Sequence, residues 1–221
     1  NEKDRISVSI YRGIDDLIFD NLGLTADWGN NTYSLSFRRV FNEKLVGNFL
    51  VASSEFFTNF NLGGDDGLNS ENKILDQTLS ANLTFFQSSD LEWRTGAQIK
   101  QLDFKYLNTF LEDTSFYIGE NPIEAGFYTK LKWKGFSRFI IEPGLRYNYY
   151  SVYSSTPYID LRLGAKYLLT EDRYINIALG NYHQFIQTVQ DDYNPTILDS
   201  WLAVDNSIDP AEAQQAVIGY E

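Results

Sequence analysis

Apolar and polar residues alternate with a period of two along most of the chain. In residues 137–149, for example, Phe139, Ile141 and Leu145 alternate with Glu142 and Arg146. Because successive side chains of a β-strand point to opposite faces, this pattern predicts strands with one apolar and one polar face. Ten strands are predicted, at Arg5–Tyr11, Asn31–Phe41, Leu45–Phe56, Leu75–Phe85, Leu91–Tyr106, Pro122–Trp133, Ser137–Tyr149, Tyr158–Leu168, Tyr174–Tyr182 and Ala213–Glu221. No segment has the pattern of a capped amphipathic helix.

The connections between these strands alternate between short and long. The short turns are Phe41–Lys44, Gln87–Asp90, Lys134–Gly135 and Thr170–Asp172. The long ones are Arg12–Asn30, Phe57–Lys73, Leu107–Asn121, the briefer Tyr150–Pro157, and His183–Glu212. Outer-membrane barrels have short periplasmic turns, long external loops and aromatic girdles. Aromatic residues do lie beside the short turns, at Trp93, Trp133, Phe136, Tyr167 and Tyr174.

The fold class predicted is therefore all-β: an antiparallel up-and-down transmembrane β-barrel in the bacterial outer membrane. The charged faces of neighbouring strands, which carry Arg, Glu, Asp and Lys, fit the polar interior of such a barrel. A soluble β-sandwich is the alternative, in which the same charged faces would be exposed to water.

Composition agrees with this class and excludes others. Aromatic residues make up 16% of the 221 residues while the mean hydropathy is only −0.33, and no apolar run approaches the ~18–20 residues of a membrane helix. The absence of cysteine excludes disulfides and thiolate chemistry within the chain. The net charge of −12 argues against a nucleic-acid partner, which requires clustered Lys and Arg.

Ten strands with open edges do not form a closed barrel, and lipid does not tolerate open edges. The sequence also ends within a predicted strand, at Gly219–Glu221. We therefore expect residues 1–221 to be part of a single outer-membrane β-barrel domain of about ten strands within a larger barrel, whose plug domain and remaining strands are not in this chain.

Two motifs near the end of the chain resemble the barrel of TonB-dependent outer-membrane receptors. The first is Gly180–Gln184 (Gly-Asn-Tyr-His-Gln) at the end of a strand, before a long connection. The second is Asn206–Glu212 (Asn-Ser-Ile-Asp-Pro-Ala-Glu), followed by a strand that carries Gly219–Glu221. Earlier, Tyr11–Asp16 and Asp27–Asn30 also resemble barrel segments of that family. The sequence departs from the family pattern at Ile208, where Leu is usual, at Ala211, which separates Pro210 from Glu212, and at Ile186, where Pro is common.

The resemblance implies energy-coupled uptake of a scarce solute such as a siderophore, vitamin or oligosaccharide. Its implied partners are the lipid bilayer of the outer membrane, the TonB protein (through the plug domain) and a small-molecule or oligosaccharide ligand. A passive porin-like channel is an alternative function. A third is an outer-membrane hydrolase that uses His183, the single histidine, as its base. No Gly-x-Ser-x-Gly motif supports the hydrolase, so we expect no enzyme, no catalytic residue and no cofactor.

Three residues of the last long connection are candidates for contacting a ligand from outside: His183, Tyr193 and Trp201. Aromatic side chains bury area at low entropic cost, although they could equally pack the connection against its neighbours. The acidic pairs Asp15–Asp16, Asp65–Asp66 and Asp191–Asp192 lie in predicted external loops, where carboxylates could hold calcium. Their spacing does not match an EF-hand, so solvated loops and no metal site are expected.

Overall fold

The computed structural model describes residues 3–64, 66–111, 113–152, 157–189, 200–204 and 209–221, and these residues form an all-β structure. One antiparallel sheet has the order β1-β2-β3-β4-β5-β7-β8-β9-β10-β13, and β6 adds to β5. Its strands are β1 (Asp4–Phe19), β2 (Leu24–Asn42), β3 (Leu45–Leu62), β4 (Leu68–Phe86), β5 (Leu91–Phe110), β6 (Asp113–Glu120), β7 (Ile123–Phe136), β8 (Phe139–Tyr150), β9 (Tyr158–Leu168), β10 (Tyr174–Gln184) and β13 (Ala211–Tyr220). A separate hairpin contains β11 (Ile186–Val189) and β12 (Ser200–Ala203). The predicted fold class is confirmed.

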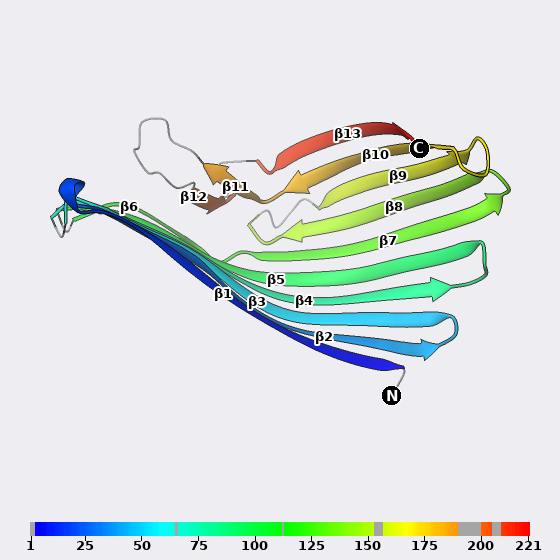
Figure 1. Cartoon of the computed structure of the whole chain (residues 1–221), viewed down its shortest axis with the longest axis horizontal. Helices are drawn as coiled ribbons and strands as arrows, with labels where there is room; N and C mark the ends of the chain where they lie inside the picture. Colours follow the sequence, from blue (N-terminus) through cyan, green and yellow to red (C-terminus); the bar gives the residue numbers. More distant parts are fainter. Residues whose placement is uncertain (1–2, 65, 112, 153–156, 190–199, 205–208) are drawn as a thin grey trace.

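The connections alternate as predicted, and Figure 1 shows the short turns gathered at the same end of the sheet as both chain termini. The short turns are residues 43–44, 87–90, 137–138 and 169–173. One predicted turn is misplaced: Lys134–Gly135 belongs to β7, which continues to Phe136. Among the described residues, no helix is long and apolar enough to cross a membrane.

Several predicted loops are in fact strand. The pairing of β1 with β2 continues without interruption to Phe19 and Leu24, and that of β3 with β4 to Leu62 and Leu68. Only the 3-10 turn η1 (Asp20–Leu22) and Gly23 separate β1 from β2. The five strands β1 to β5 therefore reach well beyond the ends of β7 to β10, as the narrow end of the sheet in Figure 1 shows.

A proline divides the strand that follows β5. β6 pairs with β5 from Phe104 to Phe110, and β7 pairs with β5 from Leu91 to Gln101. Pro122 lies between β6 and β7, where its carbonyl oxygen accepts a hydrogen bond from the Leu102 backbone N–H at 3.0 Å. Because proline has no N–H to donate, the ladder is interrupted at this point. The predicted loop Leu107–Asn121 thus contains a strand.

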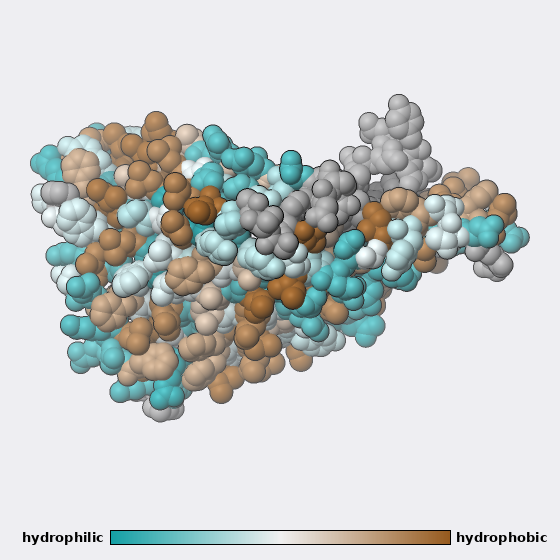
Figure 2. Space-filling view, turned by 180° about the vertical axis from the view of Figure 1, so that it is seen from behind, coloured by the Kyte–Doolittle hydropathy of each residue, from teal (hydrophilic) through white to brown (hydrophobic). Residues whose placement is uncertain are grey.

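The outer face of the sheet carries a continuous apolar band. On β4 this face presents Phe85, Leu83 and Leu79, and its first charged residue is Lys73. The ten-residue step from Phe85 to Leu75 covers about 23 Å of height, at about 3.3 Å per residue and a tilt of about 45°. This height matches the apolar belt of about 25 Å that membrane barrels present to lipid. Apolar side chains cover much of the wide end of the sheet in Figure 2.

The inner face of the same band is polar and charged. Ion pairs join neighbouring strands, including Lys100 Nζ to Asp76 Oδ2 at 3.2 Å and Lys132 Nζ to Glu142 Oε1 at 3.2 Å. The sequence predicts structural ion pairs for eight charged positions of this face. Six of them form ion pairs, namely Arg94, Lys130, Lys132, Glu142, Arg146 and Arg162. Of the other two, Arg138 lies in the turn between β7 and β8, and Lys166 lies over the Tyr174 ring. A charged interior opposite an apolar exterior is the arrangement of a barrel in lipid.

Beyond the band the two faces of β2 to β5 exchange character. We call the part of β1 to β6 beyond the apolar band the extension. There, Leu24, Ala26 and Phe60 form a buried cluster on the inner face, while the outer face carries Asp27 and Asn59, which hydrogen-bond at 2.9 Å. A sheet in water places its polar face outward and its apolar face inward. The extension therefore has the polarity of a sheet that lies outside lipid.

Candidate functional site

The richest polar cluster on the inner face lies where β8, β9 and β10 end, next to the long connections. Asp160 of β9 accepts a hydrogen bond from Asn148 Nδ2 of β8 at 2.9 Å, and its other carboxylate oxygen lies 2.7 Å from His183 Nδ1 of β10. Arg146 Nε donates to Asn148 Oδ1 at 2.6 Å, and Arg146 Nη2 lies 3.9 Å from Glu124 Oε1 of β7. We call these five residues the mouth cluster.

The backbone explains how His183 reaches this cluster. Pairing between β9 and β10 ends at Gly180 and Arg162. The Asn181 side chain then replaces the missing peptide: its Oδ1 accepts from Leu161 N at 2.7 Å, and its Nδ2 donates to the Ile159 carbonyl at 3.0 Å. This bridge holds β10 beside β9 where the backbone ladder has stopped, so His183 can contact Asp160.

The carboxylate at the centre of the cluster is buried. Asp160 is 2% exposed, and a buried carboxylate is tolerated only when hydrogen-bonded or paired. His183 and Asn148 supply the hydrogen bonds, and Arg162 adds a charge at 3.9 Å while stacking on the Tyr182 ring at 4.6 Å. The His183 imidazole also packs against Tyr158, with ring centroids 4.9 Å apart. The arrangement fixes β8, β9 and β10 to one another at this end of the sheet.

The hairpin β11–β12 follows the end of β10, beside the start of β13 (Figure 1). Phe185 stacks on Tyr150 with ring centroids 4.8 Å apart and meets Tyr158 edge-on at 5.3 Å. Together with Val204, Tyr150 and Phe185 form a buried cluster. β12 also contacts β4 and β5, although β7, β8 and β9 separate β10 from β5 in the sheet. The hairpin therefore reaches across the inner side of the sheet.

The structure describes the three predicted ligand-contacting residues to different extents. His183 was predicted in the last long connection but belongs to the end of β10, where its Nδ1 lies 2.7 Å from Asp160. Trp201 belongs to β12, and its side chain lies outside the part of the structure that is described. Tyr193 lies outside the described residues altogether. Ligand contact by these three residues stays a prediction.

The acidic pairs form no visible metal site. Asp15 and Asp16 are not in an external loop as predicted: both belong to β1, where they pair with Trp28 and Asp27 and, as successive strand residues, point to opposite faces. Asp65 and the pair Asp191–Asp192 lie outside the described residues. Within the described part of the chain, no group of three or more His, Cys, Asp or Glu side chains is placed to hold a metal ion.

Sequence reasoning missed Asp160, Asn148, Tyr150 and Phe185. The available signal was positional, because Asn148 and Asp160 both occupy inner-face positions at the same end of two neighbouring strands. The register of β8 and β9 pairs Arg146 with Asp160, and this pairing brings Asn148 and Asp160 together. Phe185 follows a strand end, and the pattern alone does not show that it turns inward.

Comparison with known proteins finds similar solved structures but no match in sequence. No protein-family model matches the sequence, and no curated protein does. Among solved structures, the copper transporter OprC is similar over 100% of this chain and 40% of its own, with a TM-score of 0.72 and 13% identity. FpvA of P. aeruginosa, solved with bound pyoverdines, is similar over 98% of this chain and 39% of its own (TM-score 0.64, 12% identity).

A third similar structure is the ferric yersiniabactin uptake receptor FyuA from Yersinia pestis, with a TM-score of 0.62 and 11% identity over 99% of this chain and 39% of its own. The chain thus spans about 40% of the length of these proteins. At such low identity the similarity establishes the fold, which is that of part of their barrels.

Proposed function

This chain has the barrel fold of the TonB-dependent receptors, and on that premise we propose that it is part of a receptor that imports a scarce solute across the bacterial outer membrane. The observation that carries the proposal is the polarity of the sheet. Its outer face is apolar over a height of about 23 Å, while its inner face carries ion pairs at the same level. Residues 1–221 would then form part of a single barrel domain, with the plug domain and further strands elsewhere in the protein.

The solutes proposed are those of the resemblance: a siderophore, a vitamin or an oligosaccharide. Similar structures include a copper transporter and a siderophore uptake receptor, which supports scarce nutrients as a class. Entry would be from the side of the extension, past the mouth cluster and the inward hairpin. Energy would come from the TonB protein acting on the plug domain.

A passive channel is the second candidate, and the hairpin β11–β12 argues against it. Phe185 is 4% exposed and packs between Tyr150 and Tyr158, so the hairpin is anchored on the inner wall of the sheet. A hydrolase has less support. Among the described residues, no hydroxyl group hydrogen-bonds to His183, whereas a serine nucleophile would need to lie within about 3 Å of that base.

Growth under limitation tests the transport proposal. The gene for the full-length protein would be deleted in cells grown with limiting iron, copper or cobalamin, in strains with and without TonB. We expect one limiting nutrient to reveal a growth defect that the TonB deletion reproduces and that the double deletion does not worsen. A defect that appears only in the receptor deletion would favour a passive channel. Unchanged growth together with an esterase activity lost in His183→Ala would favour the hydrolase.

A further inference from the structure

Two arginines lie opposite each other on the inner face of the sheet without a carboxylate beside them. Arg5 of β1 and Arg38 of β2 are direct cross-strand partners. Both alternate with outer-face residues, Ile6 and Phe37, so both belong to the inner face. Cross-strand partners have Cβ atoms about 5 Å apart, and like charges at this spacing destabilise a sheet. In the part of the chain that the structure describes, neither guanidinium group forms an ion pair or a hydrogen bond with protein.

Lysines and arginines elsewhere on this face have a carboxylate on a neighbouring strand. Examples are the pairs Lys100–Asp76, Lys132–Glu142 and Arg146–Glu124. On the inner face of β1 and β2, the one acidic residue among those described is Asp15, which lies in the extension. Arg5 and Arg38 therefore create a local positive potential on the wall of the barrel, and such a potential attracts an anion.

Two carboxamides continue the row of side chains that begins with the arginines. Arg38 pairs with Asn48 of β3, and Asn48 pairs with Asn82 of β4. The Asn48 side chain makes no hydrogen bond within the described residues. Asn82 Oδ1 accepts a hydrogen bond from the Tyr128 hydroxyl at 2.7 Å, which leaves its Nδ2 available as a donor. The row thus offers hydrogen-bond donors from four adjacent strands.

A glycine allows Tyr128 of β7 to reach Asn82 of β4. Gly96 of β5 lies between these two residues in the register of the sheet. A Cβ at Gly96 would lie 2.6 Å from Tyr128 Cε1 and would also collide with Asn82 Oδ1. The missing side chain therefore lets the tyrosine hydroxyl cross β5 and fix the orientation of the Asn82 carboxamide. A donor that is already oriented binds a ligand at a lower entropic cost than a free one.

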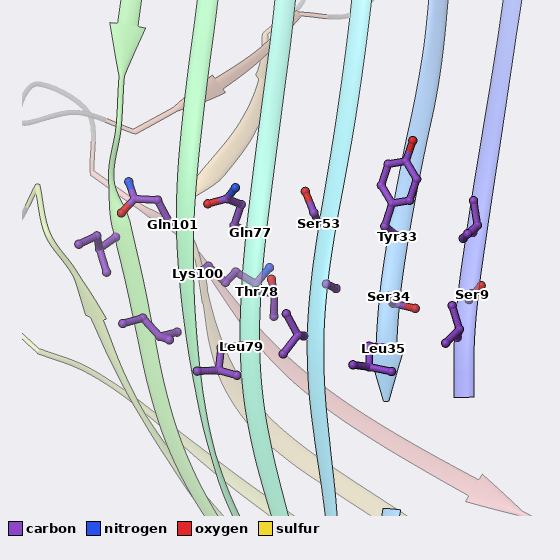
Figure 3. Close-up of a pocket in the computed structure, with 16 residues that line it drawn as sticks. Ser9, Tyr33, Ser34, Leu35, Ser53, Gln77, Thr78, Leu79, Lys100 and Gln101 are labelled. Carbon is purple, nitrogen blue, oxygen red and sulfur yellow. The ribbon is translucent and has the colours of Figure 1, made fainter. Parts of the chain in front are cut away.

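Short side chains leave the two arginines open to the inside of the barrel. The next inner-face residues along β1 and β2 are serines. Figure 3 shows Ser9 of β1, Ser34 of β2 and Thr78 of β4 at one level of their strands. Arg5 and Arg38 are themselves exposed. An anion inside the barrel can therefore reach both guanidinium groups along this part of the wall.

We propose that Arg5 and Arg38, with Asn48 and Asn82 beside them, form an oxyanion site on the inner wall near the short turns. A guanidinium group presents two parallel N–H donors to a carboxylate or a phosphate, and two opposed guanidinium groups can share one such group. The oxyanion belongs to a passing solute or to an acidic side chain of the same protein outside this chain. The inference rests on the barrel fold and not on transport.

Inorganic phosphate is the probe for a passing solute. The full-length protein, in a detergent that contains no phosphate, would be titrated with phosphate at constant ionic strength, and broadening of the phosphorus NMR signal would give the Kd. We expect saturable binding that Arg5→Gln combined with Arg38→Gln weakens at least about tenfold. Arg12→Gln is the matched control and should bind like the wild type, because Arg12 is exposed on the opposite face of β1. Tyr128→Phe releases Asn82 but keeps both arginines. It should weaken binding about threefold even if the double variant fails to fold.

Urea unfolding of the same variants tests for an acidic side chain of the protein. Such a side chain would already fill the site and prevent phosphate from binding. Replacing the arginines would leave its carboxylate unpaired, so the double variant should unfold at a lower urea concentration than Arg12→Gln. Either phosphate binding that the double variant loses or this loss of stability supports the oxyanion site and identifies its source.

Two results would overturn the oxyanion site. Phosphate binding that survives unchanged in the double variant would mean an adventitious ion only. Absence of phosphate binding, together with equal urea midpoints for the double variant and Arg12→Gln, would mean that the two guanidinium groups are merely hydrated. Failure of the growth experiment alone would contradict transport and leave the oxyanion site intact.

Discussion

Removing the Asp160 carboxylate should destabilise the protein by several kilocalories per mole. Its two oxygens accept hydrogen bonds from Asn148 and His183, at 2.9 Å and 2.7 Å, at a position that is 2% exposed. Asp160→Ala would leave the buried Asn148 amide and the partly buried His183 ring without an acceptor, and each unsatisfied group costs about 1–3 kcal/mol. We therefore expect a loss of about 3–5 kcal/mol, the usual result of breaking a buried pair. Asp160→Asn keeps one acceptor oxygen and should cost about 1–2 kcal/mol.

Urea unfolding of the full-length protein in lipid vesicles, followed by tryptophan fluorescence, measures these values. Asp103→Ala is the control, because that carboxylate is exposed on β5 and its loss should change stability by no more than about 0.5 kcal/mol. A double-mutant cycle with His183→Ala isolates the Asp160–His183 interaction, which should appear as coupling of about 1–3 kcal/mol. Equal stability of Asp160→Ala and Asp103→Ala, or strictly additive effects in the cycle, would refute a structural role for the cluster.

Three further predictions follow from single contacts. The Lys73 ammonium lowers the pKa of Glu55 below its ordinary 4.5. The pair should therefore stabilise the folded state at neutral pH and lose that contribution as pH falls through the lowered pKa. Because both side chains are partly exposed, the difference in unfolding free energy between wild type and Glu55→Gln should be at most about 1 kcal/mol and should vanish in acid. Phe185→Ala removes a buried ring from the hairpin contact and should raise ion conductance in planar bilayers, whereas unchanged conductance would mean that the hairpin does not restrict the lumen. Gly67→Ala would place a Cβ 2.0 Å from the Leu62 carbonyl oxygen at the end of β3. This clash should lower the free energy of unfolding in urea by more than about 1 kcal/mol. Gly164→Ala is the control and should be tolerated, because the nearest atom to its Cβ, Glu142 Cβ, would lie 3.5 Å away.

The sequence predicts the membrane part of the fold well because one physical rule governs it. Lipid outside and polar groups inside force alternation on every strand, and so β8, β9 and β10 are predicted to within about two residues at each end. The candidate site depends on register and on side chains that replace backbone. Nothing in the pattern around Asn181 shows that its carboxamide substitutes for a peptide group, yet that substitution sets the position of His183. The site was therefore predicted only as a region.

The errors at the external ends of β2 to β4 have a common physical cause. Along β2 the apolar residues occupy odd positions at Tyr33, Leu35 and Phe37, but even positions at Leu24 and Ala26. The strand does not change its period of two; the solvent of its outer face changes from lipid to water, so the apolar residues move to the other face. In sequence this exchange appears as a break in the pattern near Asn30 and Asn31, which resembles a loop. A search for strands that allows the apolar phase to invert once, after roughly ten residues of membrane-spanning strand, would recover the extension. It would also locate the membrane boundary on each strand whose apolar phase inverts.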